Sequence, residues 1–181
     1  MSQRLVLVSD VSGNRKDKWI TTYLAALHPY FEITYYDLQE LGKFRLSSQD
    51  LVSMRSDFLD NAWSHAQQAF IQAEKQNSAG QDTVYMGFGL GSQLVWETVA
   101  PELNPKSLWL VSSTELAPVD HVGEVPAYFY YGERDECSKL KSQDKNLSII
   151  PRFGSSMYMD DHIAQCICSH LIEVEHSLRS A

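Results

Sequence analysis

The chain has 181 residues, 44% hydrophobic and 21% charged, a composition typical of one soluble globular domain covering residues 1–181. Its formal net charge is −8 and no basic stripe stands out, so nucleic acid is not expected as a partner. The three cysteines make no disulfide framework, and the N-terminal apolar run is too short for a signal peptide or membrane span. We therefore expect a cytoplasmic protein that does not enter a membrane.

Apolar patterns of two kinds alternate along the chain. Short runs of β-branched and aromatic residues predict six strands, and apolar residues at helical spacing predict the helices between them. We expect strands at 4–10, 31–38, 82–89, 107–114, 125–131 and 147–153. We expect helices at 16–28, 47–76, 92–100 and 160–180, with one or two helical turns at 138–143.

This alternation predicts an α/β protein with a three-layer α/β/α sandwich, in which helices cover both faces of about six parallel strands. In such sheets, ligands bind at the carboxyl ends of the strands, beside the point where the strand order reverses. The residues that follow each strand are therefore the candidates for a site. They include 10–13, 87–91, 112–114, 132–136 and 153–162.

The most distinctive of these segments is "VYMGFGLGSQLVWETVA", residues 84–100, which predicts a strand, a glycine-rich corner and a helix. Its glycines have the spacing G-x-G-x-G, which departs from the dinucleotide-binding G-x-G-x-x-G, and no Gly-Lys-Ser/Thr follows for a P-loop. The better match is the nucleophile elbow G-x-S-x-G. Gly87 and Gly91 occupy the flanking positions, but Gly89 stands where the serine belongs.

The elbow serine needs an acid after a later strand and a histidine after the last strand, in that order. "YYGERDE" supplies Asp135 after the fifth strand, and "DDHI" supplies His162 after the sixth. With "GFGLG" as a broken elbow, these motifs resemble the α/β-hydrolase superfamily over nearly the whole chain. The resemblance implies a minimal, lidless version of that fold, with no cofactor and a site able to take a small acyl or ester ligand.

The resemblance also implies where the oxyanion hole would lie. One donor would be the backbone N–H of Leu90, and the second would come from the loop after the first strand, here Asp10 and Val11. A carboxylate at Asp10 would oppose a developing oxyanion unless it points away. Ser112 and Ser113, which end the neighbouring strand, are expected to line the same site.

Without a side chain, Gly89 cannot attack an acyl carbon, so a degenerate triad is expected. Glycine also suits the strained backbone of an elbow, and a negative φ at Gly89 would contradict this explanation. Other serines could replace the nucleophile: Ser92, which is expected to cap its helix, or Ser112 and Ser113. The hydroxyl would have to reach a base.

Simpler interpretations stay open for the remaining residues. Asp135 could cap a helix, and His162 could be a first-turn helix residue beside Asp160 and Asp161. No ligand spacing supports a metal site. The leading hypothesis is a pseudoenzyme that keeps a binding or interaction pocket. The alternatives are an ester or thioester hydrolase with an atypical nucleophile or His–Asp-activated water, and a structural subunit with a filled pocket and an exposed apolar patch.

Overall fold

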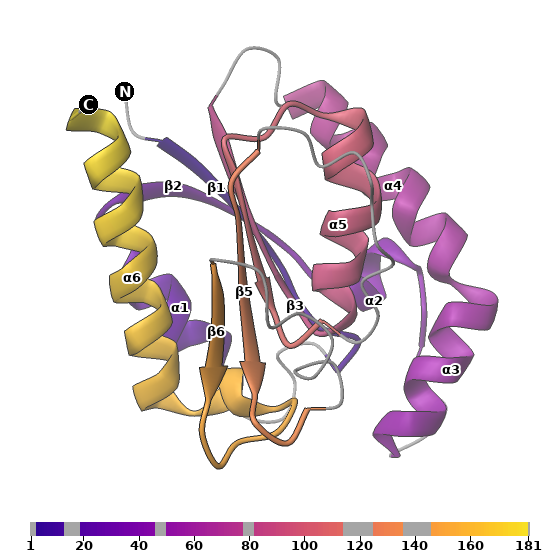
Figure 1. The fold of residues 1–181 in the computed structure, drawn as a ribbon. Helices are drawn as coiled ribbons and strands as arrows, with labels where there is room; N and C mark the ends of the chain where they lie inside the picture. The colour runs from indigo at the N-terminus through magenta and orange to yellow at the C-terminus, as the bar shows by residue number, and fades with distance from the viewer. Residues whose placement is uncertain are drawn as a thin grey trace.

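The computed structural model describes residues 3–12, 19–45, 50–77, 82–113, 125–135 and 146–180, and strands and helices alternate in it as the sequence predicts (Figure 1). The predicted helical turns at 138–143 lie outside the described residues. The elements are β1 (Gln3–Val8), α1 (Ile20–Leu27), β2 (Phe31–Tyr36), α2 (Leu38–Leu41), α3 (Leu51–Asn61), α4 (Trp63–Asn77), β3 (Thr83–Phe88), α5 (Leu90–Glu102), β4 (Ser107–Val111), β5 (Ala127–Gly132), β6 (Leu147–Ile150), the short 3₁₀ helix η2 (Met157–Met159) and α6 (Asp161–Ser180).

The six strands form one parallel sheet in the order β2-β1-β3-β4-β5-β6. The strand order reverses at β1, which has β2 on one side and β3 on the other. In register, Val8 at the end of β1 lies between Tyr36 of β2 and Gly87 of β3. The loops that leave β1 and β3 therefore start side by side at the carboxyl edge, where ligands bind in such sheets.

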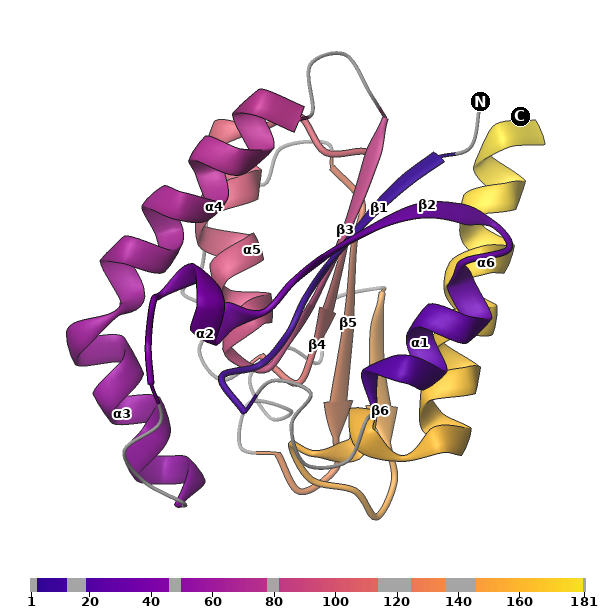
Figure 2. The same ribbon diagram turned by 180° about the vertical axis from the view of Figure 1, so that it is seen from behind.

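Helices cover both faces of the sheet, so the predicted three-layer α/β/α sandwich is confirmed (Figures 1 and 2). Helices α1 and α6 pack on one face, and α3, α4 and α5 pack on the other. Successive strand residues alternate between the two cores, as the period of a strand requires. Leu5 and Leu7 of β1 face α1 and α6, while Val6 and Val8 face the opposite helices.

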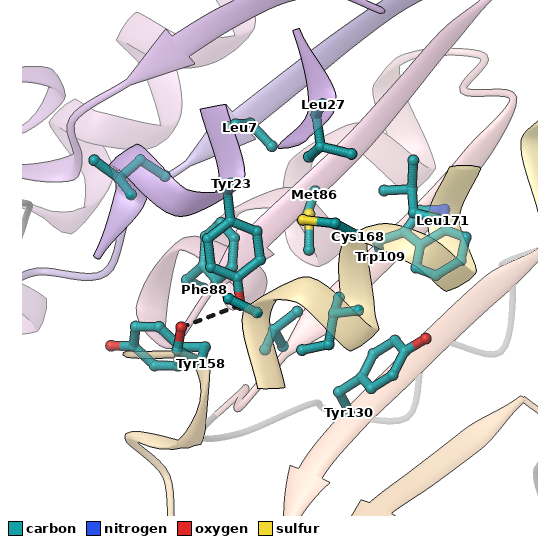
Figure 3. Close-up of a cluster of buried hydrophobic side chains, with 14 of the residues drawn as sticks. Leu7, Tyr23, Leu27, Met86, Phe88, Trp109, Tyr130, Tyr158, Cys168 and Leu171 are labelled. Carbon is teal, nitrogen blue, oxygen red and sulfur yellow. Dashed lines mark hydrogen bonds between the residues drawn. The ribbon is translucent and has the colours of Figure 1, made fainter. Parts of the chain in front are cut away.

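A cluster of aromatic side chains packs against Phe88, the last residue of β3 (Figure 3). The Phe88 ring centroid lies 4.7 Å from that of Tyr23 in α1 and 5.5 Å from that of Tyr158 in η2. Tyr23 Oη donates a hydrogen bond of 3.1 Å to the Tyr158 carbonyl. The Tyr23–Phe88 pair is edge-to-face and the Phe88–Tyr158 pair is tilted, and such aromatic contacts add to the burial energy of the rings. These contacts join η2 to Phe88, the residue immediately before Gly89.

The predicted helix over 47–76 is wrong in one respect, because the structure divides it into α3 and α4. The two helices meet at the buried Ala62, whose φ of −128° departs from helical values. Phe58 and Ala62 both pack against Gly42, where an added Cβ would lie 2.7 Å from the Phe58 ring. This close approach of the loop after α2 to the junction is a tertiary contact, which helical spacing does not reveal.

The sequence also gave no sign of a buried polar cluster beneath α4. The carboxylate of Glu74 is fully buried and accepts hydrogen bonds from Arg4 (2.7 and 2.8 Å), Tyr85 (2.7 Å) and Tyr36 (2.8 Å). Burial raises the pKa of Glu74, but these hydrogen bonds and the Arg4 charge outweigh burial and lower it. The cluster joins α4 to the sheet at the opposite end from the glycine corner.

Candidate functional site

The glycine corner is a tight turn from β3 into α5. Gly89 lies between them with φ +55° and ψ −122°, a conformation that side-chain-bearing residues rarely adopt. The strained backbone expected at this position is therefore confirmed. A Cβ at Gly87 would lie 2.5 Å from the Gly91 carbonyl oxygen, and a Cβ at Gly91 would lie 2.6 Å from the Val8 carbonyl oxygen. The flanking glycines are thus required by close packing.

Asp10 reaches from the end of β1 into this turn. Its carboxylate is 1% exposed, and Oδ1 accepts a hydrogen bond of 2.9 Å from the backbone N–H of Leu90. Leu90 is the first residue of α5, so the carboxylate also lies at the positive end of the helix dipole. The sequence left the direction of this carboxylate open, and in the structure it points into the turn.

Asp10 also fills the space where a side chain at position 89 would begin. A Cβ built on Gly89 would lie 2.7 Å from Asp10 Oδ2 and closer still to Cγ and Oδ1. Real Cβ atoms do not approach other atoms this closely. With Asp10 in this position, residue 89 has room only for hydrogen.

Two further side chains hold the other oxygen of this carboxylate. Arg55 of α3 donates from Nη2 at 3.1 Å, and Tyr158 of η2 donates from Oη at 3.2 Å, both to Asp10 Oδ2. Burial lowers the pKa of Arg55, but the charge and hydrogen bond of Asp10 raise it more, with smaller contributions from Tyr158 and Asp135. Burial, followed by the Asp10 charge, raises the pKa of Tyr158 well above its usual value. Arg55 therefore stays cationic and Tyr158 stays a neutral donor.

Sequence reasoning placed Asp10 and Leu90 in the site and missed Arg55; Tyr158 fell within the candidate segment 153–162 but was given no role of its own. Arg55 follows the buried Met54 on a helix, where an arginine is usually a solvated surface residue. Tyr158 belongs to a short 3₁₀ helix that has no sequence signature. Arg55 lies within α3, away from the strand ends where a site is expected.

Ser92 is fully engaged by the backbone around it. Its Oγ lies 2.6 Å from the Gly87 carbonyl oxygen and 3.0 Å from the Val111 carbonyl oxygen, which share its single proton, and it accepts from the Val111 N–H at 2.9 Å. It joins the start of α5 to the ends of β3 and β4 and does not cap its helix, contrary to expectation. A hydroxyl held by three backbone groups is unsuited to act as a substitute nucleophile.

Ser112 and Ser113 lie beside the turn, as the sequence predicts. The N–H of Gly89 bonds to the carbonyl of Val111 at 2.9 Å, so the end of β4 adjoins the corner directly. Both serines are fully buried, and within the described residues neither hydroxyl has a hydrogen-bond partner. Ser112 has φ +52°, a strained value for a residue with a side chain. Val11, also expected here, is buried in the loop after Asp10.

The two remaining triad candidates are Asp135, in the turn after β5, and His162, at the start of α6. Asp135 follows β5, and its backbone N–H bonds to the Gly132 carbonyl at 3.0 Å. His162 is exposed in the first turn of α6, where its backbone N–H bonds to Asp160 Oδ1 at 3.0 Å. Its ring Nε2 lies 4.0 Å from Cys166 Sγ, one turn along the helix. The structure thus gives His162 a helix-start position, and the catalytic role of the Asp135–His162 pair stays a prediction.

The described residues hold no group of three His, Cys, Asp or Glu side chains placed to bind a metal ion. In the same part of the chain, no helix is long and apolar enough to cross a membrane.

Comparison with solved structures assigns the fold. A candidate hydrolase of the alpha/beta superfamily from Xanthomonas campestris pv. campestris superposes with a TM-score of 0.69 at 15% identity, covering 96% of this chain and 99% of that one. The chain has the α/β-hydrolase fold. A lidless α/β serine hydrolase from Xanthomonas campestris gives 0.63 at 13% identity, covering 94% of this chain and 81% of that one. Est1E from Butyrivibrio proteoclasticus gives a TM-score of 0.60 at 14% identity, covering 99% of this chain and 89% of that one.

Models of protein families give no match to the sequence, and no curated protein matches it either. At 13–15% identity the likeness to the solved structures concerns the fold, so the chemistry must be argued from this chain's own residues. By its G-x-G-x-G spacing between a strand and a helix, the turn from β3 into α5 is the candidate position of a nucleophile elbow. Here that turn contains Gly89 and the carboxylate of Asp10.

Proposed function

We propose that this α/β-hydrolase-fold protein is a pseudoenzyme without serine-hydrolase activity. The observation that supports it is the position of the Asp10 carboxylate, which takes up both the place of the nucleophile and the Leu90 N–H. Attack on an acyl carbon needs a nucleophile at the elbow and donors for the oxyanion. Gly89 removes the first, and Asp10 removes a donor.

The donors around Asp10 make its departure costly. Arg55 and Tyr158 are largely buried, and both would lose an acceptor if the carboxylate swung out. Leaving such groups without a partner costs about 1–3 kcal/mol for each neutral group and more for a charged one. A substrate oxyanion would have to displace an ionised carboxylate held by three donors. We therefore treat Asp10 as a fixed part of the elbow.

We further propose that the site keeps a small acyl or ester ligand in a cytoplasmic setting. The support comes from the Ser112 and Ser113 hydroxyls, which are buried beside the elbow without partners in the described chain. Buried hydroxyls normally have hydrogen-bond partners, so their lack of one suggests a place for a polar ligand group. An uncharged carbonyl suits them because the Arg55 charge is already paired with Asp10.

The alternative function is an ester or thioester hydrolase with an atypical nucleophile. The observation that favours it is the strained φ of Ser112 combined with a hydroxyl that has no hydrogen-bond partner among the described residues, since strain of this kind is concentrated at functional sites. His–Asp-activated water is the other route, through His162 and Asp135. This route requires the His162 ring to be directed at the elbow. In the structure, the ring lies beside Cys166 at the surface.

One experiment separates these possibilities. The protein is incubated with p-nitrophenyl butyrate, a butyryl thioester and a serine-directed fluorophosphonate, followed by intact-mass and peptide mass spectrometry. We expect no turnover above the buffer rate and no adduct. An adduct on Ser112 or Ser113 that disappears in Ser112→Ala or Ser113→Ala would establish the alternative. Turnover that survives both variants but is lost in His162→Gln would establish activated water.

Binding is tested separately with ethyl butyrate, which the pseudoenzyme should hold without cleaving. Ligand-observed NMR should show saturation transfer with the wild-type protein and a weaker signal with the Ser112→Ala/Ser113→Ala double variant. The matched control is Ser177→Ala, whose hydroxyl is exposed on α6 and bonds to the Glu173 carbonyl. Equal signals for the double variant and the control would contradict the proposed ligand site.

A further inference from the structure

We propose that two copies of this chain associate through β2, whose outer edge pairs antiparallel with β2 of the second copy. Strand β2 is the end strand of the sheet, with β1 as its only strand neighbour in the part of the chain that the structure describes. Figure 2 shows β2 in the foreground, with no helix or strand drawn across its outer side. An open strand edge presents unpaired N–H and C=O groups that attract another strand.

The backbone of three residues faces this open edge. The Tyr36 carbonyl accepts a hydrogen bond of 3.0 Å from the Ser9 N–H, so the backbone groups of Tyr36 face β1. Successive residues of a strand direct these groups to opposite sides. Those of Thr34 and Glu32 therefore also face β1, and those of Phe31, Ile33 and Tyr35 face outward.

The outward-facing residues are self-complementary about Ile33. With a two-fold axis through Ile33, each copy's Ile33 faces the other's in a hydrogen-bonded pair, and Phe31 of one copy faces Tyr35 of the other. All three side chains lie on the same sheet face, against the core under α1 and α6. Aromatic and β-branched pairs of this kind stabilise antiparallel strands.

The features that normally protect an edge are missing from β2. It is six residues long, contains no proline, lysine or glycine, and has no positive φ. Its single charge, Glu32, would face Thr34 of the second copy in this register, so no like charges meet despite the net charge of −8. Half-buried Ile33 and Tyr35 would lose further surface to the second copy.

The opposite edge of the sheet is a poorer candidate and provides a matched control. Strand β6 has four residues, and its Asn146 and Ile150 carbonyls accept from Phe129 and Glu133 of the β5 side. By the same alternation, the backbone of Ile149 faces outward there, and its side chain is 40% exposed. Ile149 on β6 is thus the counterpart of Ile33 on β2.

The first test is sedimentation velocity of the full chain over a range up to about 100 µM, since self-association depends on concentration. We expect wild type and Ile149→Pro to approach twice the chain mass of 20.6 kDa. Ile33→Pro, which removes one outward N–H, should stay monomeric, with circular dichroism confirming its fold. Ile33→Lys keeps the N–H but sets like charges opposite each other, and it should weaken the dimer at least tenfold.

The second test fixes the register in a Cys166→Ser background, which removes an exposed thiol. Directly opposed residues of a hydrogen-bonded antiparallel pair have Cα atoms about 5.5 Å apart, within the range of a disulfide. Ile33→Cys should therefore cross-link two chains on mild oxidation, and Glu32→Cys should not. Monomeric wild type at the highest concentration, disruption by Ile149→Pro alone, or equal cross-linking at both positions would overturn the proposal.

Discussion

Adding one methyl group at the elbow is the most direct test of how Asp10 and Gly89 depend on each other. Gly89→Ala forces a side-chain-bearing residue into φ +55°, which costs about 1–3 kcal/mol. Its Cβ would also meet the Asp10 carboxylate at 2.7 Å or less from each terminal atom, and overpacking of this kind costs about 1–3 kcal/mol. Alanine recovers about 0.4–1 kcal/mol through the unfolded chain. We expect the free energy of unfolding to fall by about 1–6 kcal/mol.

The same substitution should cost less once Asp10 is shortened. Asp10→Ala alone should be destabilising by about 2–4 kcal/mol, because Leu90, Arg55 and Tyr158 each lose their acceptor. In that background, Gly89→Ala retains the backbone strain but no longer meets the carboxylate. The double-mutant cycle should therefore give a coupling free energy of about 1–3 kcal/mol.

The assay is urea unfolding of the four proteins, followed by circular dichroism and tryptophan fluorescence to confirm two-state behaviour. Gly154→Ala is the matched control, because its Cβ would meet no atom within 4 Å. Gly154→Ala should change the unfolding free energy little. In the Asp10→Ala background its effect should be the same as in wild type, so that the two effects are additive. A Gly89→Ala cost that is the same in both backgrounds, within about 0.5 kcal/mol, would falsify the shared occupancy of the elbow.

Three further substitutions test the contacts around the sheet by the same unfolding assay. Ser92→Ala should lower the unfolding free energy by about 1–3 kcal/mol, since buried backbone groups lose a partner; no loss would contradict its role as a link between α5 and β4. Arg55→Met should cost about 2–4 kcal/mol by leaving the Asp10 carboxylate without its cation, and an unchanged midpoint would contradict the ion pair. Glu74→Gln should cost about 2–4 kcal/mol at pH 7. Because folding lowers the pKa of Glu74 from 4.5, its contribution is complete above that pH and is lost on acidification, so the difference from wild type should shrink below pH 4.5; a constant difference would contradict this.

Much of the fold follows from the sequence because each strand has a local signature. Apolar runs such as "RLVLV" and "YFYY" mark strands buried on both faces, and their alternation with helices leaves few possible topologies. The close packing around Gly87 and Gly91 was also predictable, since the nucleophile-elbow spacing implies it. The division between α3 and α4 was not, because it depends on where Gly42 contacts the chain.

The candidate site was predictable in its position but not in its internal contacts. Strand ends identify Asp10, Leu90 and Ser112, because parallel strands bring their carboxyl ends to one edge. Nothing in the local sequence shows that Arg55, 45 residues after Asp10, pairs with it across the turn. The direction of the Asp10 side chain depends on that pairing and on Tyr158, so it could be learned only from the folded chain.

The contacts of Asp10 change what the glycine at position 89 implies for the chemistry of this turn. A serine replaced by glycine alone would leave an oxyanion hole that a compensating nucleophile could use. Here the Leu90 N–H is already bound to Asp10, and Asp10 is held by Arg55 and Tyr158 from two other elements. A serine side chain placed at position 89 would meet the carboxylate, and removing the carboxylate would leave Arg55 without its Asp10 partner. On the proposed function, neither single change would create an active elbow, because the contacts of Asp10, Gly89 and Arg55 depend on one another.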